Sequence, residues 1–92
     1  MIISFKNKAL EDFFLNGEVR KIKQDHIRKL RLVLAKLHAA QDIKDMNFPG
    51  SNLHSLRGSL KNYWSVSVNS NWRLIFQFQN GEASLVDYVD YH

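Results

Sequence analysis

YWSVSVNSNWRLIFQFQNGEASLVDYVDYH, residues 63–92, is the stretch that decides the fold, because it holds three strand-like runs separated by two turns. Apolar side chains alternate with their neighbours over residues 63–68 and again over 72–78, which is the period of a half-buried β-strand. Asn80-Gly81 is a strong signal for a two-residue hairpin turn. We therefore expect consecutive antiparallel strands in this half of the chain.

The cross-strand register follows from placing the apolar side chains on one face of the sheet. A three-residue loop, 69–71, then joins the first two strands, and the turn at 80–81 joins the next two. The expected pairs are Val68 with Trp72, Ser67 with Arg73, Gln79 with Glu82, Tyr88 with Arg73, Asp90 with Asn71, and His92 with Asn69.

On this register one face of the sheet carries a polar cluster at one end. Its members are Ser67, Arg73, Tyr88, Asp90 and His92. The opposite face carries an apolar core that includes Trp64, Trp72 and Phe76. Two residues depart from the pattern. Asp87 falls on the apolar face, and Tyr91 points away from the cluster unless the last strand twists or bulges.

Two helices are expected in the first half, after a short apolar run at residues 2–5 that predicts an opening strand. Asn7 is suited to cap the first helix and Gly17 to end it. Asp25 is suited to cap a second, longer helix. The apolar stripe of that helix consists of Ile27, Leu30, Leu34 and Leu37. Residues 48–52 break the helical region. The predicted fold class is α+β, with two helices as one layer.

The composition fits one small globular domain, residues 1–92, with 45% hydrophobic and 12% aromatic residues. No cysteine occurs, which excludes disulfides and thiolate metal sites. The start of the chain lacks the pattern of a signal peptide, and no apolar run approaches the roughly 18 residues of a membrane span. We expect a cytoplasmic protein with no membrane partner.

Positive charge is concentrated in residues 20–36, although the whole chain has a net charge of only +4. This segment has seven cations and one acid, whereas the rest has six cations and eight acids. The cations are Arg20, Lys21, Lys23, Arg28, Lys29, Arg31 and Lys36. Such a concentration favours binding of a polyanion such as RNA. A solvated helix face that keeps a small protein soluble is an equally good explanation, and both stay open.

The polar cluster has the residue types that metal-free RNA cleavage needs. His92 is suited to exchange a proton near neutral pH, and Asp90 can orient it. His54 and Arg57 precede the strands, and Arg73 adds a second guanidinium that suits a phosphate. In such cleavage a base deprotonates a ribose 2′-hydroxyl, that oxygen attacks the adjacent phosphorus, cations hold the developing charge, and an acid protonates the leaving 5′-oxygen.

Each of these residues also has an ordinary structural explanation. Most histidines in short domains lie on the surface or make structural hydrogen bonds, and we expect His26 and His38 to be of that kind. Arg73 can simply be a cross-strand partner of Tyr88. Asp87 falls on the opposite face from Asp90 and His92, and no further acids converge there, so we expect no metal site and no cofactor. The residues alone predict a small α+β domain that binds RNA.

Three motifs taken together resemble the HigB toxins of HigB/HigA toxin-antitoxin systems, which belong to the RelE superfamily. They are LHSLRG at residues 53–58, YWSVSVNSNWRLIFQF at 63–78, and DYH at 90–92. The similarity covers the whole chain. It implies a microbial RNase fold, with two N-terminal helices packed on a twisted, mainly antiparallel sheet. It also implies a ribosome-dependent endoribonuclease that cuts messenger RNA in the ribosomal A site, with adenine-rich codons favoured.

The resemblance also implies roles for individual residues. The catalytic positions are His54, Arg73, Asp90, Tyr91 and His92. Arg57 and Arg73 match cations near the cleaved phosphate, and the basic segment 20–36 would meet ribosomal RNA. Arg57 stands where lysine also occurs in the family, and Asn69 stands where a cation is often found. The implied partner is a HigA-like helix-turn-helix antitoxin. DNA would be bound only through that antitoxin.

Two other functions are compatible with the same scaffold. A non-catalytic toxin resembling the ParE branch of the superfamily would inhibit DNA gyrase. A plain RNA-binding domain would bind isolated RNA and would not arrest growth. The cluster formed by His54, Arg73 and the last residues favours the nuclease, because a gyrase inhibitor has no need of it.

Overall fold

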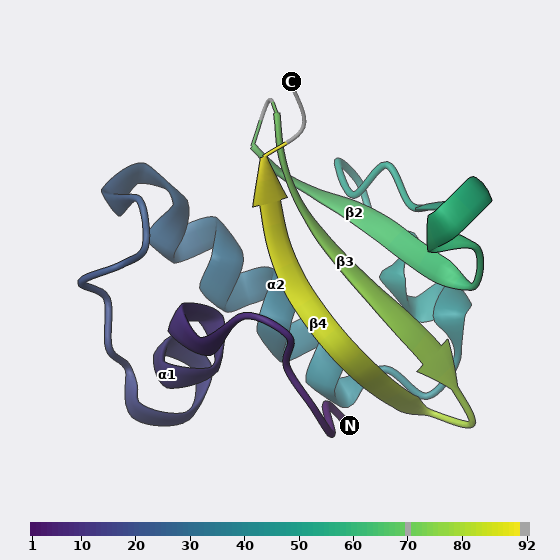
Figure 1. Cartoon of the computed structure of the whole chain (residues 1–92), viewed down its shortest axis with the longest axis horizontal. Helices are drawn as coiled ribbons and strands as arrows, with labels where there is room; N and C mark the ends of the chain where they lie inside the picture. The colour runs from purple at the N-terminus through teal and green to yellow at the C-terminus, as the bar shows by residue number, and fades with distance from the viewer. Residues whose placement is uncertain (70, 91–92) are drawn as a thin grey trace.

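An antiparallel sheet of four strands forms one layer of the protein in the computed structural model, which describes residues 1–69 and 71–90. The strands follow one another in space as they do in sequence. They are β1 (His54–Ser55), β2 (Tyr63–Asn69), β3 (Trp72–Gln79) and β4 (Glu82–Asp90). Figure 1 shows the sheet twisting across the molecule, with the helices on one side of it. The predicted α+β fold class is confirmed.

The turn between β3 and β4 has the predicted form. Asn80 and Gly81 both have positive φ, at 54° and 78°, as a two-residue hairpin turn of type I′ requires. Gln79 lies opposite Glu82, as expected. The opening run at residues 2–5 lies along the outer edge of β4, where it forms two isolated parallel bridges and no continuous strand.

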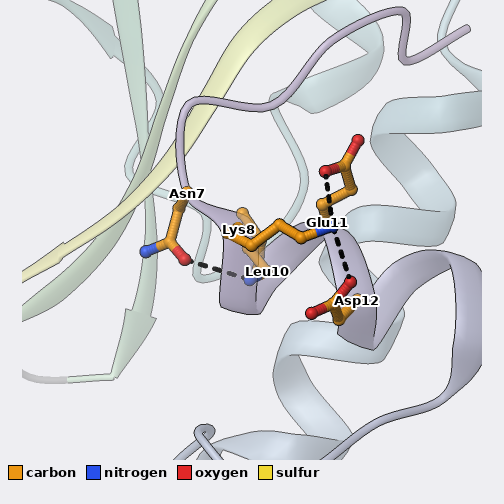
Figure 2. A network of polar contacts seen from close by, with 5 residues as sticks. All are labelled: Asn7, Lys8, Leu10, Glu11 and Asp12. Atoms are coloured by element: carbon orange, nitrogen blue, oxygen red, sulfur yellow. Dashed lines mark hydrogen bonds and ion pairs between the residues drawn. The ribbon is translucent and has the colours of Figure 1, made fainter.

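Helix α1 (Lys8–Asn16) begins at the predicted residue. The side-chain oxygen of Asn7 accepts a hydrogen bond from the backbone N–H of Leu10 at 3.0 Å, which satisfies a donor that the helix leaves unpaired (Figure 2). The Lys8 ammonium lies 3.6 Å from a carboxylate oxygen of Glu11 and 3.2 Å from one of Asp12. These pairs are exposed, so they stabilise the first turns only slightly.

The other predicted helix boundaries are only partly correct. Gly17 ends α1 with a φ of 71°, a left-handed conformation that glycine adopts readily. Asp25 does not cap the second helix. It lies inside a single 3₁₀ turn, η1 (Gln24–His26), and α2 (Ile27–Ala39) continues directly from that turn with His26 at its N-cap and no side-chain capping bond.

The core lies between the helices and one face of the sheet. Helix α2 buries Leu30, Val33, Leu34 and Leu37. The predicted stripe is thus confirmed at three positions, whereas Ile27 is only half-buried and Val33 takes its place. Two further 3₁₀ turns, η2 (Ile43–Met46) and η3 (Gly58–Leu60), lie in the connection from α2 to β2. Neither α1 nor α2 has the length and apolarity of a membrane span, nor has any shorter helix in the described ranges.

The register between β2 and β3 is confirmed at Ser67, which lies opposite Arg73. Beyond that pair it shifts, so Asn69 lies opposite Trp72, not Val68. The sequence pattern alone does not show this irregularity, because both Val68 and Trp72 still face the core.

A β-bulge between β3 and β4 changes the rest of the predicted register. Ile75 lies opposite Asp87 and Gln77 opposite Ser84, so two residues of β4 face one residue of β3. Leu85, one of the two, has a φ of 53°.

The bulge shifts the pairing of the end of β4 with β3 by one residue. Tyr88 therefore lies opposite Leu74 and Asp90 opposite Trp72, and the predicted pairs of Tyr88 with Arg73 and of Asp90 with Asn71 are wrong. The predicted pair of His92 with Asn69 lies outside the described residues.

Candidate active site on the face away from the helices

The bulge decides which side chains of β4 share a face with Arg73. Because one extra residue reverses the alternation, Asp87 moves to the Arg73 face, and Tyr88 and Asp90 move to the Trp72 face. The predicted single cluster of Arg73, Tyr88 and Asp90 is therefore wrong. It fails because the predicted register assumed unbroken alternation along the last strand, although the departure of Asp87 from the apolar pattern was a sign of the bulge.

Arg73 lies near one end of this face, as the second residue of β3, and contacts two serines. Its Nη1 lies 3.5 Å from the hydroxyl oxygen of Ser65 and 3.4 Å from that of Ser67. Ser65 is fully buried and Arg73 is half-buried, so the guanidinium is directed by neutral partners along β2. Such a group offers paired donors to a phosphate in a fixed geometry.

His54 lies on the same face, on the neighbouring edge strand, where it pairs with Ser65. Its Nδ1 lies 2.9 Å from the carbonyl oxygen of Asn52. A carbonyl can only accept, so the neutral imidazole carries its proton on Nδ1 and leaves Nε2 with a lone pair. The side chain is exposed. His54 is therefore arranged as a base that a ligand on this face can reach.

The sheet brings His54 and Arg73 to within reach of one substrate. They are two strands apart and offset by two residues, which corresponds to about 12 Å between their Cα atoms. Because the guanidinium of Arg73 contacts Ser65, which pairs with His54, it leans toward the histidine.

Four further residues were predicted to belong to the site. Arg57 is exposed and follows β1 as the N-cap residue of η3. Asp90 is exposed at the end of β4, where it lies opposite Trp72, the first residue of β3. Tyr91 and His92 lie outside the described residues.

His26 and Tyr88 form a buried pair on the core side of the sheet, whereas the sequence pattern placed Tyr88 in the polar cluster and His26 outside it. The hydroxyl of Tyr88 is hydrogen-bonded to Nδ1 of His26, and Trp72 packs on Tyr88 with ring centroids 4.5 Å apart. Burial raises the pKa of Tyr88 to about 12, with added effects from the negative charges of Asp25 and Asp90. His26 lies four residues before Leu30, at the helical spacing of the apolar stripe. That spacing was the sequence signal that His26 is buried.

The seven cations of the basic segment do not form one surface. Three of them lie against different aromatic rings: Lys23 over Trp72 at 5.6 Å, Arg31 over Phe13 at 5.6 Å, and Lys36 over Phe48 at 5.1 Å. Lys29 shares the ring of Phe48 at 5.9 Å, and Arg20 pairs with Glu18 at 3.0 Å. Lys21 and Arg28 are exposed. The positive charge therefore surrounds α2 instead of following one face of it.

No three His, Asp or Glu side chains within residues 1–69 and 71–90 are arranged to hold a metal ion.

Solved structures with a similar fold include a bacterial toxin-antitoxin complex. A YoeB-YefM toxin-antitoxin complex from Staphylococcus aureus matches all of this chain and 95% of its own with a TM-score of 0.66 at 17% identity. A YafQ mutant from E. coli matches 98% of this chain and 91% of its own with a TM-score of 0.65 at 20% identity. The fold is therefore that of the RelE-like toxins.

The amino-acid sequence shows to which family of these toxins the chain belongs. Residues 3–92 match the HigB-like toxin family, the RelE-like toxins of type II toxin-antitoxin systems, and the chain belongs to that family. It is 37% identical over 92 residues to the endoribonuclease HigB of Proteus vulgaris, with both chains covered completely. It is also 37% identical over 98 residues to toxin HigB-1 of Vibrio cholerae serotype O1, covering 100% of this chain and 98% of that one.

Proposed function

We propose that this protein is an endoribonuclease toxin that cuts messenger RNA in the A site of the ribosome and so stops translation. The observation that carries the proposal is the shared face of His54 and Arg73, found in a chain that belongs to the HigB-like toxins. The name of the Proteus vulgaris relative, endoribonuclease HigB, supports the same activity.

The proposed chemistry is transfer of the phosphate to the neighbouring 2′-oxygen. One base takes the proton of the ribose 2′-hydroxyl, and the new P–O bond forms as the bond to the 5′-oxygen breaks. Arg73, with Arg57 beside the strand that carries His54, would hold the phosphate and its developing charge. An acid then protonates the 5′-oxygen, which leaves a 2′,3′-cyclic phosphate and a 5′-hydroxyl.

The catalytic residues proposed beside Arg73 are His54 and the terminal residues Asp90, Tyr91 and His92. The hydrogen bond from Nδ1 of His54 to the Asn52 carbonyl supports His54 as the base, because it leaves Nε2 unprotonated in the neutral ring. His92, oriented by Asp90, would be the acid. Neither step needs a metal ion or another cofactor.

The proposed partners are the ribosome, messenger RNA and a cognate antitoxin, all in the cytoplasm. The cations around α2 would contact ribosomal RNA. The structural match to a YoeB-YefM toxin-antitoxin complex supports an antitoxin partner. We propose that the antitoxin is a HigA-like helix-turn-helix protein. The toxin would bind DNA only through this antitoxin.

Primer extension on a translated message tests the proposal. The wild-type protein should produce new 5′ ends within codons, whereas His92→Ala and Arg73→Ala should abolish them while ribosome binding persists. His38→Gln is a matched control, because His38 lies on α2 and accepts a backbone hydrogen bond that glutamine can also accept. Uncut message with wild-type protein would reject the proposal, and growth arrest with inhibited gyrase would favour the ParE-like alternative.

A further inference from the structure

A second feature of the Arg73 face is a hollow of about 640 Å³ near its opposite end. Tyr63, Gln77 and Ser84 form one row across β2, β3 and β4, and all three line it. Asn62 and Gln79 complete the polar rim. Because Gln77 lies an even number of residues from Arg73 on β3, the hollow and the candidate active site open on the same face.

The lining chemistry restricts what the hollow can bind. It consists of side-chain amides, hydroxyls, aromatic rings and the aliphatic side chain of Leu56, and it has no Lys, Arg, His, Asp or Glu. A phosphate or a metal ion would find no opposite charge there. An uncharged planar group with donors and acceptors on its edge fits well, because amides can pair with that edge and a tyrosine ring can stack on its face. An unpaired nucleobase is such a group.

The position of the hollow relative to Arg73 fits a single RNA strand. Gln77 follows Arg73 by four residues, which corresponds to about 13 Å along β3. Ser55, the residue that follows His54 on β1, also lines the hollow. A strand whose phosphate lies between His54 and Arg73 can therefore place a base farther along the same face.

We propose that this hollow binds an unpaired base of the messenger RNA and so sets which sequences the toxin cuts. The proposal rests on the proposed nuclease function, since it takes the cleaved phosphate to lie at Arg73. Gln77 and Tyr63 would be specificity-determining residues, with Gln77 pairing with the base edge and Tyr63 stacking on the ring. They would have no part in proton transfer.

The test compares cleavage-site profiles on a pool of translated messages. Gln77→Leu keeps the size of the side chain and removes its donor and acceptor, and Gln79→Ala changes an exposed lining residue that contributes little to folding. We expect both to keep cutting, with the preference among codons changed on the order of tenfold. Glu82→Gln is the matched control, because Glu82 faces Gln79 across the hairpin but does not line the hollow.

Binding of single-stranded homopolymer RNA hexamers separates this inference from the proposed function. A base-dependent affinity that Tyr63→Leu and Gln79→Ala weaken would support the hollow even if the wild-type protein cut no message. The opposite result requires that the wild type cuts message. If Gln77→Leu and Gln79→Ala then have the same codon profile and the same hexamer affinities as the wild type, the hollow does not bind a base.

Discussion

The hydroxyl of Tyr88, near the end of β4, is hydrogen-bonded to Nδ1 of His26, in the turn that precedes α2. Both residues are buried, with 9% and 3% of their surface exposed, and the Trp72 ring packs against both of them. The contact therefore fixes the last part of β4 to the helical layer. It does so two residues before Asp90, where the proposed catalytic end of the chain begins.

Removing this contact should lower the free energy of unfolding. Tyr88→Phe keeps the packing on Trp72 but leaves Nδ1 of His26 buried without its partner, which costs about 1–3 kcal/mol. Tyr63→Phe is the control, because Tyr63 is only half-buried, and it should change stability by less than about 0.5 kcal/mol. Urea unfolding measures both, and equal stability of the two variants would show that the bond contributes nothing.

The raised pKa of Tyr88 predicts a loss of stability in strong alkali. Its ordinary value is 10.0, and burial raises it to about 12 in the folded protein. The folded state therefore holds the phenol proton more tightly than the unfolded state. This stabilisation is complete below pH 10 and is lost as pH rises through 12, by at most about 2–3 kcal/mol.

Tyr88→Phe cannot titrate, so the stability difference between the wild type and this variant should shrink from pH 9 to pH 12. Comparing the two proteins cancels the other tyrosines and the lysines, which titrate in the same range. A difference that stays constant over this range would mean that the phenol of Tyr88 titrates normally.

The strands and helices could be predicted from sequence because each has a clear period, and the Asn80-Gly81 turn fixes where β3 meets β4. The predicted register failed at two places, at the end of β2, where Asn69 and not Val68 lies opposite Trp72, and in β4 beyond position 84. The bulge in β4 adds one residue, which the position of Asp87 in the apolar pattern indicated but did not locate, so Tyr88 and Asp90 were assigned to the wrong face. The pair of His54 with Ser65 was also beyond prediction, because a two-residue strand has no period.

Leu85 carries the backbone strain of that bulge. Its φ of 53° costs a side chain other than glycine or asparagine about 1–2 kcal/mol, and its side chain is 38% exposed. Leu85→Asn and Leu85→Gly should therefore leave the unfolding free energy unchanged or raise it by up to about 1 kcal/mol. Leu85→Ile should lower the unfolding free energy by at least about 1 kcal/mol, because β-branched residues tolerate a positive φ least.

Ser84→Gly is the matched control for the glycine substitution. Ser84 precedes the bulge on β4 and does not share the positive φ, so glycine there should cost about 0.5–1 kcal/mol. Thermal unfolding of the three Leu85 variants and of Ser84→Gly measures the order of their stabilities. If Leu85→Gly proves as destabilising as Ser84→Gly, the bulge stores no strain at this residue.

The cations around α2 should make ribosome binding depend on salt. Lys36 is exposed and lies 5.1 Å from the ring centre of Phe48, so Lys36→Glu reverses a charge without disturbing the core. If Lys36 contacts a phosphate, the variant should bind ribosomes more weakly and its slope of log affinity against log salt should fall by about 1. Lys6→Glu makes the same charge change at an exposed site outside the basic segment, and it should leave the slope unaltered. Sedimentation binding at several salt concentrations measures both slopes, and equal effects of the two variants would mean that α2 attracts RNA only through the net charge of the protein.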